Sequence, residues 1–293
     1  MKSFETFHPL VIFAFFAAAI GLSMFFMHPA YLVITIFLAV SLNIALRRGQ
    51  FFKDWKLYVP LFFLMAIINP LISHNGKLIL FYINYNAITV EAIVYGLSIA
   101  TMIVSIILWF SCYNETMTTD KFIYLFGKIS PVFSLTLSIS LRLVPRFQQQ
   151  LHKISNAQKV IGMDYRSGSL LHRIKCTLRI ISILITWALD NAIDTADSMK
   201  ARGYGIGKRT SFSLFIFERR DGIVLLFIMF LLMVNIWASI IGTTTFYFYP
   251  TFSIIQWDLK NILFYCSYFL LLAIPIIIEI KGGIEWKLLK SKM

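Results

Sequence analysis

The sequence predicts an all-α membrane protein that crosses the bilayer several times. Hydrophobic residues make up 58% of its 293 residues, whereas soluble domains contain roughly 45–50%. The mean hydropathy is correspondingly high, at +0.76. Apolar runs near the ~20 residues that cross a bilayer recur along the chain, at 10–27, 30–46, 57–73, 92–112, 223–242 and 261–280. We therefore expect about six transmembrane helices, with a cytoplasmic domain of one short and two long amphipathic helices.

The positive charges indicate how these spans are oriented. All but two of the 27 lysines and arginines lie in segments on one side of the predicted membrane, and the exceptions are Lys77 and Lys260. Because cytoplasmic loops carry the excess of Lys and Arg, both termini should be cytoplasmic. The net charge of +13 is then mainly an orientation signal. We expect no nucleic-acid partner, since that function needs a basic face on a soluble module.

Residues 1–113 should form the first four spans. The first run has small residues that resemble a signal-peptide cleavage site, but it stays apolar through Phe26 and is interpreted as a retained span. The segment 47–56 combines cations with aromatic residues and should be a cytoplasmic interfacial loop. The outer segment 74–90 has the alternation and β-favouring residues of a short hairpin.

Residues 114–222 should form a cytoplasmic helical domain, and 223–293 the last two spans and the tail. Thr118-Thr119-Asp120, before Phe122, can cap a short helix that ends at Gly127, and long helices are expected over 131–160 and about 170–201. Their apolar stretches, Val132–Leu141 and Ile180–Leu189, are only about ten residues long. Because ~20 residues are needed to span, both helices are predicted to lie at the cytoplasmic interface.

The end of the second long helix has a distinctive pattern. Three acidic residues, Asp190, Asp194 and Asp197, lie opposite its apolar face. They could be metal ligands or a proton path, but a polar face paired with Lys200 and Arg202 is the favoured interpretation. Gly203 should then adopt the left-handed conformation that ends helices, with Arg202 where the helix dipole favours a cation.

Sequence patterns for catalysis are missing. Gly127-Lys128 lacks the upstream glycine of a phosphate-binding Walker loop, and Gly203-x-Gly205 follows a helix rather than a strand. The three cysteines form no CxxC pair and no metal-ligand pattern with the five histidines. We therefore predict no catalytic residue, no cofactor and no metal site.

The segment 196–205, Ala-Asp-Ser-Met-Lys-Ala-Arg-Gly-Tyr-Gly, resembles the Ala-Arg-Gly signature of the transmembrane coupling subunit of energy-coupling factor (ECF) ABC importers, the EcfT/CbiQ family. In that family each long cytoplasmic helix ends in such a motif, whose Arg docks in a groove on an ATPase. The resemblance implies ATPase-coupling roles for Ala201, Arg202 and Gly203. The first motif aligns with Val160, Ile161 and Gly162, where Ile161 replaces the family's Arg.

The resemblance also implies the partners and the location. Two ABC ATPases, identical or different, would hydrolyse ATP, and a small substrate-binding membrane (S) subunit would carry a vitamin, metal or other micronutrient across a prokaryotic cell membrane. The chain itself would have neither a nucleotide site nor a solute site. The apolar faces of the long helices would contact the S subunit through Leu135, Ile139, Ile181, Ile185, Ala188, Ala192 and Ala196.

Three other functions are compatible with parts of the sequence. The permease of an ordinary ABC transporter couples through one short cytoplasmic loop rather than a domain of about 110 residues. An intramembrane enzyme needs polar residues in a membrane cavity, but the predicted spans contain few beyond Asn43, Asn69 and Glu279. The third alternative is a membrane scaffold without a transport function, which the sequence does not exclude.

Overall fold

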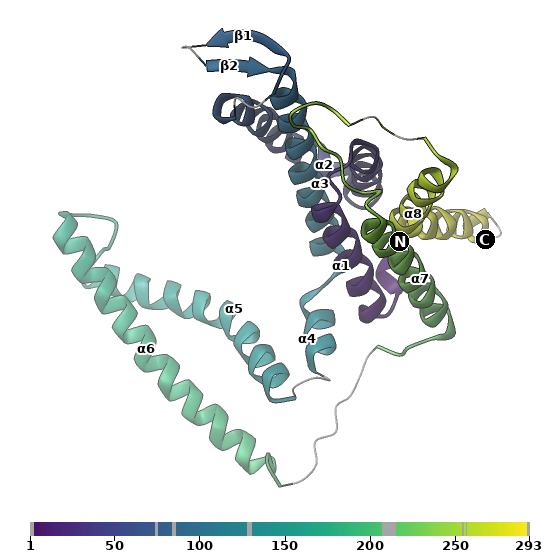
Figure 1. Cartoon of the computed structure of the whole chain (residues 1–293). Coiled ribbons are helices and arrows are strands. Elements are labelled where there is room, and N and C mark those ends of the chain that lie inside the picture. The colour runs from purple at the N-terminus through teal and green to yellow at the C-terminus, as the bar shows by residue number, and fades with distance from the viewer. Residues whose placement is uncertain are drawn as a thin grey trace. The chain divides into compact units, whose positions relative to one another are not determined.

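The computed structural model describes residues 3–73, 76–83, 86–127, 131–206, 215–253, 255 and 257–291, and it is almost entirely helical (Figure 1). The chain divides into two compact units. The membrane unit comprises Met1–Phe122 and Phe215–Met293, and the hairpin unit comprises Ile123–Leu214. The elements are η1 (Phe4–Thr6), α1 (Pro9–Phe25), α2 (Pro29–Ile72), β1 (Ile79–Ile83), β2 (Asn86–Thr89), α3 (Val90–Thr116), α4 (Thr119–Gly127), α5 (Pro131–Val160), α6 (Leu170–Ala201), α7 (Arg219–Ile241) and α8 (Leu259–Ser291).

Six helical stretches of the described chain are long and apolar enough to cross a membrane. They are Pro29–Arg47, Phe51–Ile72, Val90–Thr116, Leu170–Ala201, Arg219–Ile241 and Leu259–Lys290. Their number agrees with the sequence-based expectation, but the set differs. The apolar helix α1 has only 17 residues, whereas α6 qualifies with a hydropathy of 1.4, the lowest of the six. Length and composition thus do not exclude α6 from the membrane, contrary to the expectation from its ten-residue apolar core.

The predicted interfacial loop over 47–56 is wrong, because α2 stays helical there. Only Arg47 leaves helical geometry, with φ −131° and ψ 39°, and it separates the two spans of α2 by a kink. Its guanidinium pairs with Asp54 (3.3 Å) and Glu115 (3.5 Å) and also contacts Ser111. The bend is therefore fixed by ion pairs to α2 itself and to α3, which the local sequence does not reveal.

Both halves of α2 pack against α3 in the core of the membrane unit. In the first half, the buried Asn43 donates from Nδ2 to the carbonyl oxygen of Leu108, at 2.8 Å. In the second half, Gly96 of α3 lies against the backbone of α2, so that a Cβ there would lie 2.7 Å from the carbonyl oxygen of Ala66. A side chain at position 96 would therefore push the two helices apart.

The short hairpin predicted within 74–90 is confirmed. Strands β1 and β2 pair antiparallel, with Ile83 opposite Asn86. The fully buried carboxylate of Glu91, at the start of α3, accepts the backbone N–H groups of Lys77 and Leu78 at 3.1 and 3.2 Å. A buried carboxylate requires such donors, and here they fix the loop before β1 onto the first turn of α3.

The predicted short helix and two long helices are confirmed as α4, which crosses the boundary between the two units, and as α5 and α6 of the hairpin unit. At ~1.5 Å per residue, α5 and α6 are about 45 and 48 Å long. They pack through Phe147 and Trp187, whose ring centroids are 5.6 Å apart, and Ile154 of α5 is buried. On α6 the buried residues are Cys176 and Ile180. Most of the α6 surface is therefore exposed in this single chain.

Candidate functional site

The two long helices end in the same backbone structure. At the end of α5, Gly162 has φ 80°. Its N–H donates to the carbonyl of Lys159 (3.0 Å), and the N–H of Met163 donates to that of Gln158 (2.9 Å). These two bonds define a Schellman cap, in which the left-handed residue is normally glycine.

At the end of α6 the pattern recurs, as the sequence predicted for Gly203. This glycine has φ 81°. Its N–H donates to Lys200 (2.9 Å), and the N–H of Tyr204 donates to Met199 (3.0 Å). The residue before each capping glycine is therefore in an equivalent position: Ile161 at the first end and Arg202 at the second.

Both positions present their side chains outward. Val160 and Ile161 are 89% and 71% exposed, and Ala201 and Arg202 are exposed as well. The structure does not bring the two motifs together, because Ile161 precedes α6 and Arg202 follows it. The length of α6, about 48 Å, separates them. One partner groove therefore cannot hold both ends.

The acidic face of α6 is solvent-exposed. Asp197 forms the expected ion pair with Lys200, at 3.8 Å, and both side chains are mostly exposed. Within the described residues, no group of three His, Cys, Asp or Glu side chains could hold a metal ion. An exposed pair of this kind contributes at most about 1 kcal/mol to stability.

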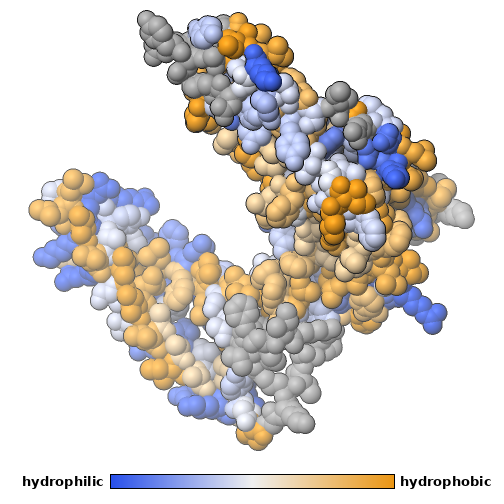
Figure 2. All heavy atoms as spheres, in the orientation of Figure 1, coloured by the Kyte–Doolittle hydropathy of each residue, from blue (hydrophilic) through white to orange (hydrophobic). Residues whose placement is uncertain are grey.

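The apolar face predicted to contact the S subunit is only partly the one that packs inside the hairpin. Ile181 and Ile185 are 43% and 54% exposed. Ala192 and Ala196 are also exposed, whereas Ala188, Leu135 and Ile139 are half-buried. The buried residues of α6 are Cys176 and Ile180, and Ile180 lies one residue before Ile181 on the helix. Figure 2 shows apolar side chains along this hairpin.

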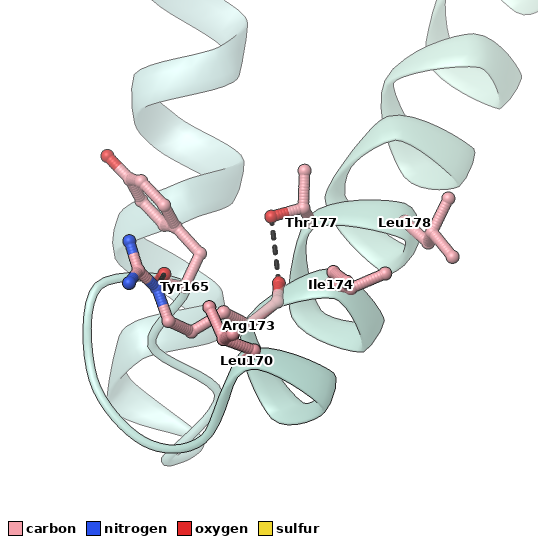
Figure 3. Close-up of a pocket in the computed structure, with 6 residues that line it drawn as sticks. All are labelled: Tyr165, Leu170, Arg173, Ile174, Thr177 and Leu178. Carbon is pink, nitrogen blue, oxygen red and sulfur yellow. Dashed lines mark hydrogen bonds between the residues drawn. The ribbon is translucent and has the colours of Figure 1, made fainter.

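A groove at the α5–α6 turn was not predicted from the sequence. Its volume is 390 Å³, and its lining consists of Tyr165, Leu170, Arg173, Ile174, Thr177 and Leu178 (Figure 3). The Arg173 side chain extends toward Tyr165 and donates from Nε to its carbonyl oxygen, at 3.1 Å. Leu170, Ile174 and Leu178 recur at helical spacing on α6, which is the signal that could have revealed this apolar strip.

Sequence reasoning also missed the residues that hold the chain where it leaves the membrane unit. Lys121 of α4 is 6% exposed. Its ammonium donates to the carbonyl oxygens of Glu5 (2.8 Å) and Thr116 (2.9 Å). Burial lowers the pKa of Lys121, while the charge of Glu5 opposes this shift. A single buried lysine in a short helix gives no sequence signal of its own.

A second buried charge holds the chain where it returns to the membrane unit. Asp221, 1% exposed, accepts the N–H of Glu218 (3.0 Å) in a capping box and that of His8 (3.4 Å). The N-terminal segment is tied further to α8, because the N–H of Ser3 donates to Glu279 at 2.8 Å. Residues 3–8 thus contact the segment that precedes the hairpin unit in the sequence and the segment that follows it. The acid three residues after Glu218 is the sequence signal for this cap.

Comparison with known proteins gives a consistent family assignment. The model of the CbiQ family, described as cobalt transport protein, matches residues 5–212. Relatives named energy-coupling factor transporter transmembrane protein EcfT include one from Lactococcus lactis subsp. cremoris, 30% identical over 60% of this chain and 71% of its own length. Those from Bacillus subtilis and Staphylococcus aureus are 29% and 28% identical, over 66% and 69% of this chain and 85% and 80% of their own lengths. Because the family model covers more than half of the chain, the protein belongs to the CbiQ family of transport proteins.

Proposed function

We propose that this chain is the transmembrane coupling subunit of an ECF-type ABC importer. The observation that carries the proposal is the pair of identically capped, exposed helix ends at Gly162 and Gly203. They are separated by the ~48 Å length of α6. This spacing suits contact with two separate ATPase subunits, one at each end, and the relatives' names support the same assignment.

In this proposal the chain transmits motion and does not hydrolyse ATP. Closure of the two ATPases on ATP moves the helix ends, and the α5–α6 pair carries that motion to the exposed face that includes Ile181 and Ile185. A separate S subunit, bearing the micronutrient, docks on this face. The ATPase-coupling residues are Val160, Ile161, Gly162, Ala201, Arg202 and Gly203.

The proposal places α6 in the cytoplasm although its length and composition would allow it to span. If α5 and α6 both crossed the membrane, the turn between them would carry its lysines and arginines to the outside, against the positive-inside rule. With residues 114–222 in the cytoplasm, α1 becomes the first of six spans. Its 17 residues reach about 26 Å, close to the ~30 Å hydrocarbon thickness.

Cysteine labelling tests this topology. The exposed native Cys266 is first replaced by Ser, and the native Cys112 and Cys176 are buried. One new cysteine is then introduced, either at Ser167 in the α5–α6 turn or at Thr251 between α7 and α8. Both positions are exposed. A membrane-impermeant maleimide applied to intact cells should label Thr251→Cys and leave Ser167→Cys unlabelled until the cells are lysed. Efficient labelling of Ser167→Cys in intact cells would contradict the cytoplasmic location.

Co-purification tests the coupling function. The chain should hydrolyse no ATP when purified alone, and should retain ABC ATPases when it is co-expressed with them. Addition of an S subunit from the same transporter to this complex in proteoliposomes should produce ATP-dependent solute uptake. The matched control omits only the S subunit. Uptake by the single chain without ATPases would refute the proposal.

A further inference from the structure

The two helix ends share a backbone but differ in charge. Residues 159–179 around the α5–α6 turn carry one carboxylate, Asp164, and the cations Lys159, Arg166, Arg173, Lys175 and Arg179. Residues 190–206 at the other end carry Asp190, Asp194 and Asp197 with the cations Lys200 and Arg202. The first end is therefore strongly basic even though Ile161 occupies the position equivalent to Arg202. We call residues 159–179 the basic corner.

Several of these cations are held in place by the turn itself. Arg166 donates from Nε to the Tyr165 hydroxyl (2.9 Å), with its guanidinium 5.3 Å from the ring centroid. Arg173 donates from Nε to the Tyr165 carbonyl (3.1 Å), and Arg179 donates to the sulfur of Met163 (2.8 Å). A guanidinium has five N–H donors, so one such bond orients the group and leaves others for a partner.

The centre of the basic corner is apolar and open. Leu170 and Leu171 are 75% and 81% exposed, and Ile161 is 71% exposed. Figure 2 shows apolar side chains at this tip of the hairpin, with hydrophilic ones around them. An exposed apolar centre with a charged rim has the composition of a protein interface. Because the charged residues around this apolar centre are mostly cations, the partner surface should be acidic.

We propose that Arg166 and Arg173 supply, at the α5 end, the charge that Ile161 lacks, and that they dock on a carboxylate-bearing surface of an ATPase subunit. This inference rests on the proposed coupling function. Orientation of both guanidiniums by Tyr165 favours a folded partner, because paired N–H donors bind a fixed carboxylate in bidentate geometry. A fluid layer of lipid headgroups offers no such fixed partner, although it also carries negative charge.

The test uses the full chain in nanodiscs with the ABC ATPases co-expressed from its own transporter. The variant Arg166→Glu/Arg173→Glu reverses the charge of these two residues and so removes the net positive charge of the basic corner. Its control, Arg146→Glu/Lys153→Glu, makes the same change in charge at two exposed positions of α5 outside the corner. We expect the rim variant to bind ATPase at least about tenfold more weakly, with the control close to wild type. Wild-type binding should weaken as salt screens the contact.

Two further measurements distinguish an electrostatic contact with the ATPase from binding to anionic lipid. Arg166→Lys/Arg173→Lys keeps the charge but cannot form the bidentate pair, so its binding should fall between that of wild type and that of the Glu pair. A Lys pair as weak as the Glu pair would overturn the electrostatic role. Hydrogen exchange should show that ATPase protects residues 159–179 in nanodiscs of phosphatidylcholine alone. Protection that requires phosphatidylglycerol and does not depend on ATPase would assign the basic corner to the membrane and overturn the proposal.

If wild type binds no ATPase, the coupling function itself fails. If wild type binds and the rim variant matches the control, only this inference fails.

Discussion

The membrane unit and the hairpin unit use charged residues in opposite ways. In the membrane unit, Lys121 and Asp221 are buried and bonded to the N-terminal segment of the same chain. In the hairpin unit, Arg202 and the Asp197–Lys200 pair are exposed at the end of α6. Buried charges must find partners within the fold, whereas exposed ones stay available to another protein. The difference agrees with the proposed function, in which the hairpin unit is the part of the chain that binds partner subunits.

The largest effect is expected at the exposed charge that the proposal assigns to an ATPase groove. Arg202→Glu removes charge-assisted hydrogen bonds and adds repulsion, and loss of one partner of such a pair typically costs about 2–5 kcal/mol. We expect ATPase association to be abolished in pull-downs from matched membranes. Lys153→Glu makes an equal charge change on α5 and should bind normally. Retained binding by Arg202→Glu would remove the functional distinction between the units.

A buried cation of the membrane unit should affect stability rather than partner binding. Lys121→Met keeps the apolar stem but leaves the carbonyls of Glu5 and Thr116 without their donor. Such unsatisfied buried groups cost about 1–3 kcal/mol. The melting temperature of the purified chain should therefore fall, while the folded fraction still binds ATPase.

The matched control for this comparison is Lys200→Met, in the hairpin unit. The Lys200 side chain is 76% exposed and forms a surface ion pair with Asp197, so its replacement should change stability by less than about 0.5 kcal/mol. Equal losses of melting temperature in the two variants would contradict the assignment of stability to buried contacts.

A smaller effect is expected at the glycines that both helix ends share. Gly162→Ala and Gly203→Ala place a Cβ on a residue with φ 80° or 81°, which costs about 1–2 kcal/mol. Position 162 has no atom within 4 Å of the new Cβ, so the cost there is backbone strain alone. Hydrogen exchange should show faster opening of the last turn of each helix.

Gly283→Ala is the control, because Gly283 lies within α8 and a Cβ there meets no atom within 4 Å. Alanine in a helix interior is favoured over glycine by about 0.5–1 kcal/mol. This variant should therefore be neutral or slightly stabilising. An equally benign result at Gly162 and Gly203 would show that the two caps do not depend on glycine.

The hairpin unit was more predictable from the sequence than the membrane unit, for a physical reason. Its helix ends are set by local signals, such as Ser169 before α6 and Gly203 after it. The packing of the membrane unit depends on residues far apart in the chain. Asp221 bonds to His8, and the kink at Arg47 depends on Glu115. Periodicity identifies apolar faces, but it does not specify which face meets which helix, so the α6 surface that packs on α5 was not predicted either.

The smallest effects on ATPase binding are expected at Ile161, where the two helix ends differ most in chemistry. Ile161 is 71% exposed, and full burial of an Ile side chain against a partner gains about 1.5–3 kcal/mol at most. Ile161→Ala should therefore weaken ATPase association and leave measurable uptake, unlike Arg202→Glu.

Ile161→Arg sharpens the comparison further, because it makes the two ends alike in sequence. If Arg166 and Arg173 already provide the charge of the basic corner, a further cation gains little and is repelled by its neighbours, so ATPase binding should stay within about twofold of wild type. The twofold limit corresponds to roughly 0.4 kcal/mol. Each ATPase is quantified separately in the pull-down, with Arg202→Lys as a conservative change at the other end. Clearly tighter binding by Ile161→Arg would argue for two equivalent grooves, each with an unused site for a motif arginine, and against a distinct basic corner.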